Sequence, residues 1–132
     1  MNRSIRKIVP LLALVSLATS CALFDSGTVW QDGRYALLWI DLPNEVTLDF
    51  HQDGGGWAPL VDKRIFAVGS DHHYIVAKQH PDGDRSRTNF YLIDKTKDEF
   101  HCVQGPMNEA AFLKLKAQLG LPAFSKTLES LQ

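Results

Sequence analysis

The feature that most constrains the fold is a series of short segments in which apolar and polar residues alternate with a period of two. The clearest is Glu45–Gln52, "EVTLDFHQ", whose inward face is apolar and whose outward face consists of Thr47, Asp49 and His51. Such alternation is typical of a strand with one buried face. Arg34–Leu42 is apolar on both faces, which indicates a central strand, and Pro43-Asn44 predicts a hairpin turn between the two.

Similar segments continue along the chain and predict further strands, namely Arg64–Ser70, His73–His80, Thr88–Lys95 and Glu99–Val103. Turn-forming residues separate them, most clearly the Asp-Gly pair within Pro81–Arg87. A flexible loop is expected at Asp53–Gly56, "DGGG". Because strand follows strand through short connections, the sequence predicts an antiparallel meander.

The period changes near the end of the chain. Apolar residues at helical spacing predict a helix over Glu109–Leu119, with Asn108 as its N-cap and Gly120 as its stop signal. A second short helical turn is expected within Ala123–Leu131. The predicted class is therefore α+β: an antiparallel β-sheet meander with a C-terminal helix packed on one face.

Composition indicates a single domain, expected from Thr28 to the end of the chain. The 132 residues are 45% hydrophobic and 22% charged, as in ordinary globular domains. Three of the 14 basic residues and none of the 15 acidic residues lie in the first 20 positions, so the remainder is mildly acidic. Such a domain lacks the basic footprint of a nucleic-acid-binding protein.

The first 20 residues have the pattern of a secretory signal peptide. Basic residues precede the apolar run Ile8–Leu17, which spans only about 15 Å as a helix, too short to cross a bilayer. The run ends in "ATSC", which resembles the lipobox of bacterial lipoproteins. That resemblance implies transfer of a diacylglyceryl group to the Cys21 thiol, then cleavage before Cys21, modification with palmitate, and Ala22–Gly27 as a short tether. The alternative is an ordinary signal peptide in which Cys21 is incidental.

Cys102 has no intramolecular partner if Cys21 carries lipid. It alternates with Phe100 in "EFHCV", which predicts a buried strand thiol. An intermolecular disulfide and a catalytic thiol are the alternatives.

The polar motifs do not converge on one chemistry. In "SDHH", Ser70–His73, adjacent histidines on a strand would point to opposite faces, which disfavours a metal site. The members of a hydrolytic triad converge from separate segments and no "GxSxG" motif occurs, so polar turn residues are favoured. Asp82 and Asp84 lie in a loop without the ligand spacing of a calcium site. Gly54–Gly56 lacks the Lys-Ser/Thr of a phosphate-binding loop. No catalytic residue, metal or cofactor is predicted.

Four residues are candidates for a partner-binding surface: Trp30, Trp57, Arg85 and Arg87. The tryptophans lie near predicted strand ends and the arginines on a hairpin tip. Trp and Arg are enriched in binding hot spots. A core position is the alternative for each tryptophan.

The segments Tyr74–Pro81, Phe90–Asp94 and Gly105–Gly120 together resemble a family of small, functionally uncharacterised bacterial lipoproteins with the pattern "YIVAK-HP", "YxID" and "GP…F…LG". The resemblance concerns structural motifs and implies a fold without assigning a site residue. It implies a lipoprotein of the cell envelope. Ala22, rather than Asp, directly after the lipobox cysteine favours the periplasmic face of the outer membrane.

The expected function is accordingly a non-enzymatic binding domain, held at the membrane by lipid on Cys21, that recognises an envelope protein. An inhibitor or immunity protein against a lysozyme or toxin is the first alternative. The chain lacks the "SGARY"-like motif and the paired cysteines of the familiar lysozyme-inhibitor lipoproteins. A small envelope hydrolase or metal-dependent enzyme that uses His72, His73 and His80 is the second alternative.

Overall fold

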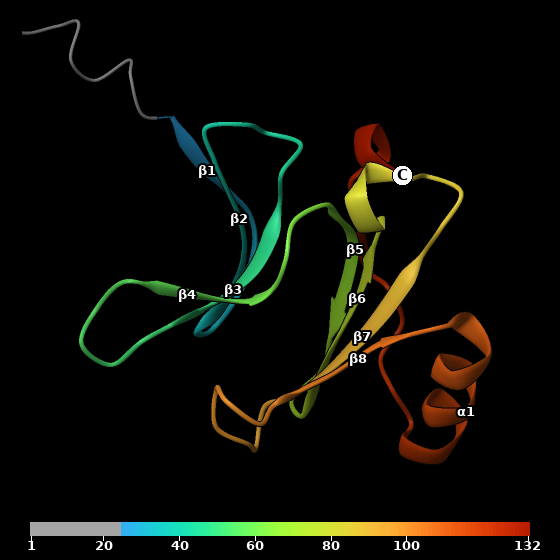
Figure 1. Ribbon diagram of the computed structural model, residues 1–132. Coiled ribbons are helices and arrows are strands. Elements are labelled where there is room, and N and C mark those ends of the chain that lie inside the picture. Colours follow the sequence, from blue (N-terminus) through green and yellow to red (C-terminus); the bar gives the residue numbers. More distant parts are fainter. Residues whose placement is uncertain (1–24) are drawn as a thin grey trace, which may run out of the picture.

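The computed structural model describes residues 25–132, which form two antiparallel sheets and one α-helix (Figure 1). The first sheet has the order β1–β2–β3–β4, with the bounds β1 Ser26–Asp32, β2 Tyr35–Ile40, β3 Thr47–His51 and β4 Trp57–Val61. The second has the order β8–β7–β6–β5–β9, with the bounds β5 Ile65–Ser70, β6 Tyr74–Gln79, β7 Asn89–Asp94, β8 Val103–Met107 and β9 Lys126–Thr127. The antiparallel pairing is confirmed, but the strands divide into two sheets instead of forming one meander.

The two sheets are formed because the chain turns sharply between β4 and β5. Arg64 has a positive φ of 74°, and the Ile65 N–H donates to the carbonyl of Val46 at 3.0 Å. Both sheets contribute to one core, which includes Leu37 and Leu48 from the first and Ile75 and Ile93 from the second. Each sheet thus buries one apolar face against the other.

The predicted hairpin of β2 and β3 is confirmed, with Leu37 opposite Leu48, and β2 lies between β1 and β3. One expectation for this hairpin is wrong. Asp49 was expected to face solvent, but its exposed fraction is 6%. The Thr47 hydroxyl donates to its Oδ1 at 2.5 Å, which partly replaces the lost water.

In the first sheet, β1 and β4 were not predicted from the sequence. β1 begins at Ser26, so the last two residues of the expected tether belong to a strand, and β4 follows the glycine-rich loop. β4 contains Pro59 and lies at the edge of its sheet, where a missing N–H is tolerated.

The predicted strand Glu99–Val103 is wrong, because its first residues form a turn. The Asp98 carboxylate accepts a hydrogen bond from the Phe100 N–H at 2.9 Å and contacts the His101 Nδ1 at 2.8 Å. This arrangement turns Phe100 outward, and β8 begins only at Val103. Cys102 is buried in the core as expected, but it precedes the strand.

Helix α1 spans Glu109–Leu119, as predicted. The Asn108 side chain accepts a hydrogen bond from the Ala111 N–H at 2.8 Å, and Gly120 adopts the left-handed conformation that ends the helix. Phe112 is the buried residue of α1, and its ring stacks on Phe90 of β7 with 4.8 Å between centroids.

The segment after α1 differs from the expected helical turn. Lys126–Thr127 pairs with β5 as β9, and only Glu129–Leu131 forms a 3₁₀-helix, η3. Short 3₁₀ geometry also occurs at η2, Pro81–Gly83, on the hairpin between β6 and β7. Within residues 25–132, no helix has the length and apolar character needed to cross a membrane.

Candidate functional site

A cleft of about 510 Å³ lies where one end of the first sheet meets the connection between β7 and β8. Its position follows from the strand register, because Asp32 pairs with Tyr35 and Tyr35 pairs with Phe50 at the same end of the sheet. The lining residues are Asp32, Gly33, Arg34, Tyr35, Phe50, Asp53, Lys95, Lys97, Asp98, Glu99 and Phe100. Three aromatic rings therefore share the cleft with charges of both signs.

Lys95 joins the two sheets at the base of this cleft. Its Nζ lies 2.5 Å from the Asp32 Oδ2 of β1 and donates to the carbonyl oxygen of Asp71, between β5 and β6, also at 2.5 Å. The hydrogen bond from Lys95 lowers the pKa of Asp32. The Asp32 carboxylate is therefore ionised at neutral pH and forms an ion pair with Lys95.

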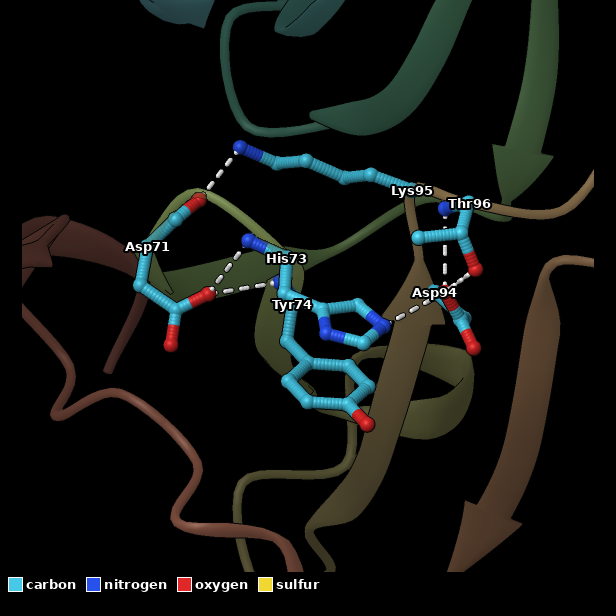
Figure 2. A network of polar contacts seen from close by, with 6 residues as sticks. All are labelled: Asp71, His73, Tyr74, Asp94, Lys95 and Thr96. Carbon is cyan, nitrogen blue, oxygen red and sulfur yellow. Dashed lines mark hydrogen bonds and ion pairs between the residues drawn. The ribbon is translucent and has the colours of Figure 1, made fainter.

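Figure 2 shows a network of polar contacts among the segments that carry Asp71 and Lys95. The Asp71 carboxylate accepts hydrogen bonds from the N–H groups of His73, at 2.8 Å, and Tyr74, at 2.7 Å, and the bond from Tyr74 lowers the pKa of Asp71. On the facing strand, the Asp94 carboxylate accepts from the hydroxyl and N–H of Thr96, and the hydroxyl bond lowers the pKa of Asp94. His73 Nε2 lies 3.2 Å from the Asp94 Oδ1, and this contact links the turn before β6 to the turn after β7.

Arg34 also lines the cleft. Its Nη2 lies 2.7 Å from the Asp53 Oδ1, its Nε donates to the carbonyl of His51 at 2.9 Å, and its guanidinium lies 4.4 Å from the centre of the Phe50 ring. The Arg34–Asp53 pair is largely exposed, so it contributes little to stability and remains available to another charged group.

Phe100 forms the rim of the cleft and, within residues 25–132, is the most exposed of the large apolar residues, with 84% of its surface accessible. The loop that carries it is ordered by the Asp98 carboxylate, which holds the Phe100 N–H and the His101 ring. The contact with His101 lowers the pKa of Asp98. A fixed loop that presents an aromatic side chain to solvent is typical of a recognition surface.

Two carboxyl groups of the cleft are not tuned as general acids. Asp32 and Asp98 have lowered pKa values, and a general acid at neutral pH needs a raised one. Burial raises the pKa of the nearby Cys102 thiol, which disfavours its nucleophilic thiolate form. Among residues 25–132, no group of three or more His, Cys, Asp or Glu side chains is placed to hold a metal ion.

The structure does not bring the four sequence-predicted binding residues together. Trp30 is partly buried against the core, whereas Trp57 is 38% exposed at the start of β4, edge-on to His51. Arg85 and Arg87 are exposed on the hairpin between β6 and β7, where Arg85 donates to the carbonyl of Ser130 at 2.8 Å. Cys21, the predicted acylation site, lies outside the described residues.

The histidines of the sequence motifs have separate local roles. His72 is exposed in the turn between β5 and β6, confirming the expected polar turn, and His73 contacts Asp94 and stacks on Tyr74. His80 is buried, stacks on Phe66, and its Nδ1 donates to the carbonyl of Arg87 at 2.8 Å.

The sequence reasoning missed the cleft residues Arg34, Lys95 and Phe100. A local signal for the last was present in "DKTKDEF", Asp94–Phe100, where a run of polar turn formers ends in a large apolar residue. For Arg34 and Lys95 no local signal existed, because their positions depend on contacts between distant segments.

The fold and the cleft together define a small α+β domain of two antiparallel sheets with an ion-paired cleft at one end. The chain belongs to the family described as "Protein of unknown function (DUF3997)", whose match covers residues 32–131. That range includes nearly all of the described domain, and the cleft residues from Asp32 to Phe100 lie within it. No curated protein and no solved structure matches the chain significantly.

Proposed function

We propose that this protein is a lipoprotein, anchored through acylated Cys21 on the periplasmic face of the outer membrane, whose domain binds an envelope protein without catalysis. The observation that carries the binding role is Phe100, 84% exposed on an ordered loop at the rim of the charged cleft. The sequence pattern before Cys21 supports the anchor.

The position of the cleft suits an anchored protein. The described chain starts beside Ser26, at one end of β1, whereas Asp32 at the other end of β1 lines the cleft. Seven residues of strand separate these points by about 20 Å. In Figure 1 the loop between β7 and β8 lies toward the end of the molecule opposite the start of β1. An anchor at Cys21 would therefore leave the cleft facing away from the bilayer.

The chemistry of the cleft suits a protein partner. Phe100 and the partly buried Phe50 offer apolar surface, the buried Tyr35 also lines the cleft, and the surrounding charges are of both signs. Interfaces combine aromatic anchors with a polar rim in this way. Inhibition of a lysozyme or toxin is the second candidate function, favoured by the protruding, internally fixed loop around Phe100, since such a loop can enter an enzyme's cleft.

The anchor is tested on protein purified from cell envelopes. We expect intact-mass analysis to find a chain that starts at Cys21 and carries acyl groups, and Cys21→Ser to move the protein to the soluble fraction. A bare cysteine would refute the anchor.

The binding role is tested by placing a photo-crosslinking residue at position 100 or, as the matched control, at Leu113, which is 50% exposed on α1. We expect position 100 to give a discrete crosslinked partner and position 113 to give none. Phe100→Ala should weaken binding of that partner at least about tenfold, in the range of a hot-spot truncation, while Leu113→Ala leaves it unchanged.

If the partner is an enzyme, the same variants decide between the two candidate functions. An inhibitor lowers the turnover of its partner, and Phe100→Ala restores it. If both positions crosslink equally, the cleft is not the recognition site.

A further inference from the structure

We infer that Ile40 and Leu42 form a second membrane contact, in which their side chains enter the lipid interface beside the anchor. The inference rests on the proposed acylation of Cys21. It identifies the end of the domain that contacts the bilayer, and it identifies the contact as an apolar one with lipid.

Ile40 and Leu42 are unusually exposed for their type. Their exposed fractions are 65% and 52%, and they flank a single residue on the loop between β2 and β3. Single apolar residues are common on protein surfaces and need no explanation. Two large aliphatic side chains displayed at the end of β2 and the start of the following loop are less ordinary and indicate a surface that is covered in the working state.

The backbone holds this loop in a fixed shape. Asp41 has a positive φ of 68°, a conformation that few residues other than glycine adopt readily. Its N–H donates to the carbonyl of Asp25 at 2.8 Å, and the Leu42 N–H donates to the carbonyl of Ile40 at 2.8 Å. The loop is therefore fastened directly to Asp25, where the described chain begins.

The length of chain before Asp25 limits where the loop can be. Only three residues lie between Cys21 and Asp25, so the four Cα–Cα steps reach about 14 Å when the chain is fully extended. Ser26 pairs with Ile40 in the sheet, so the strand end beside the loop is the part of the domain nearest to the anchor. Figure 1 shows the loop between β2 and β3 near the start of β1. A bilayer that holds Cys21 is therefore within reach of both side chains.

The charges around the loop identify the kind of lipid contact. Asp25, Asp41 and Glu45 are acidic, and Lys63 lies 3.5 Å from Glu45. This local excess of negative charge is not attracted by anionic headgroups. The contact therefore depends on apolar insertion by Ile40 and Leu42, as in shallow interfacial anchors.

The experiment uses a chain that starts at Cys21, which retains both sheets and both core clusters of the described domain. Its Cys21 thiol is coupled to a maleimide-headgroup lipid in phosphatidylcholine nanodiscs that also contain spin-labelled lipid, while Cys102 is protected by burial. Methyl NMR then reports which side chains approach the lipid. We expect loss of the Ile40 and Leu42 methyl signals, while those of Leu113 and Leu119, which are comparably exposed on α1, are retained.

A double variant, Ile40→Ser with Leu42→Ser, separates insertion from mere closeness to the anchor. Its fold is checked by the methyl signal of the buried Ile75. We expect the Asp41 amide to be broadened by the spin label in the native chain and to recover in the variant. Equal broadening in both chains, or equal signal loss at Leu42 and Leu113, overturns the inference.

Failure of the inference and failure of the proposed anchor are distinguishable, because in the nanodisc experiment the lipid is attached to Cys21 by maleimide chemistry and not by the cell. The NMR result does not depend on whether cells acylate Cys21. Intact mass of the cell-derived protein tests the acylation itself and says nothing of Ile40 or Leu42.

Discussion

Asp49 is a carboxylate held on the side of the first sheet that faces away from the shared core, since it follows the core residue Leu48 along β3. It is 6% exposed, and burial raises its pKa. A carboxyl whose pKa is higher in the folded than in the unfolded state binds its proton more tightly when folded. The native state is therefore favoured by this group at low pH and loses that advantage as pH rises from the unfolded pKa to the folded pKa.

We therefore expect Asp49→Asn to increase the free energy of unfolding at pH 7 by about 1 kcal/mol, because the amide retains an acceptor for Thr47 without a buried charge. At pH 3 the difference should largely disappear. Urea unfolding at both pH values measures this, with the exposed Asp82→Asn as the control. A variant that is less stable than the native protein at pH 7 would show that the charge of Asp49 is needed.

The same residue shows what a sequence pattern leaves open. Alternation correctly put Leu48 and Asp49 on opposite faces, but it does not say how far neighbouring side chains cover the second face. Phe100 is the converse case. Its apolar side chain predicted an inward position in a strand. In the structure its N–H donates a hydrogen bond to the Asp98 carboxylate, and the segment forms a turn.

At the level of elements, the sequence predicted a helix or strand correctly where the contacts that determine it are local. Helix α1 was predicted with its bounds, because Asn108 and Gly120 act within one turn of its ends. The hairpin of β2 and β3 was found for a similar reason. β9 could not be found, since Lys126–Thr127 is a strand only through pairing with β5, about 60 residues away.

Gly69 is the point where β5 admits the C-terminal segment. A Cβ added there would lie 1.9 Å from the carbonyl oxygen of Ala123 and 3.1 Å from the Phe124 Cα, and neither is the end of a flexible side chain. Gly69→Ala must therefore displace the backbone that leads to β9. We expect a loss of stability of about 2 kcal/mol, as for other overpacked sites.

Hydrogen exchange measures which part of the structure is destabilised. The amides of Ser125 and Leu128, which donate to carbonyls of β5, should exchange faster in Gly69→Ala. Gly54→Ala is the matched control, because its added Cβ has open space and its backbone does not need a positive φ. Equal stability of the two variants would mean that the C-terminal segment adapts without cost.

On the scale of the whole molecule, the strands run between two functionally different ends. One carries the start of the described chain with Ile40 and Leu42, and the other carries the cleft with Phe100. This polarity was not visible from the sequence, since it requires the relative placement of two sheets. The Lys95 contact at the base of the cleft is one polar link between them, because it joins Asp32 of β1 to the second sheet.

We expect a double-mutant cycle of Asp32→Asn and Lys95→Met to give a coupling of about 1 kcal/mol at pH 7, modest because the Asp32 side chain is 36% exposed. The exposed pair Arg34–Asp53 is the control and should give almost none. Since Lys95 lowers the pKa of Asp32, the stabilisation is complete above the unfolded Asp pKa of about 3.9 and is lost as pH falls through the lower folded value.

The coupling should therefore be equal at pH 7 and pH 5 by urea unfolding, and should vanish in strong acid. If the sheets rely on this link to shape the cleft, Lys95→Met should also weaken binding of the partner captured through position 100. Arg34→Met, with Lys95 intact, should change the affinity for that partner without changing the free energy of unfolding. Additive effects of Asp32→Asn and Lys95→Met at pH 7 would show that this ion pair does not help to hold the two sheets together.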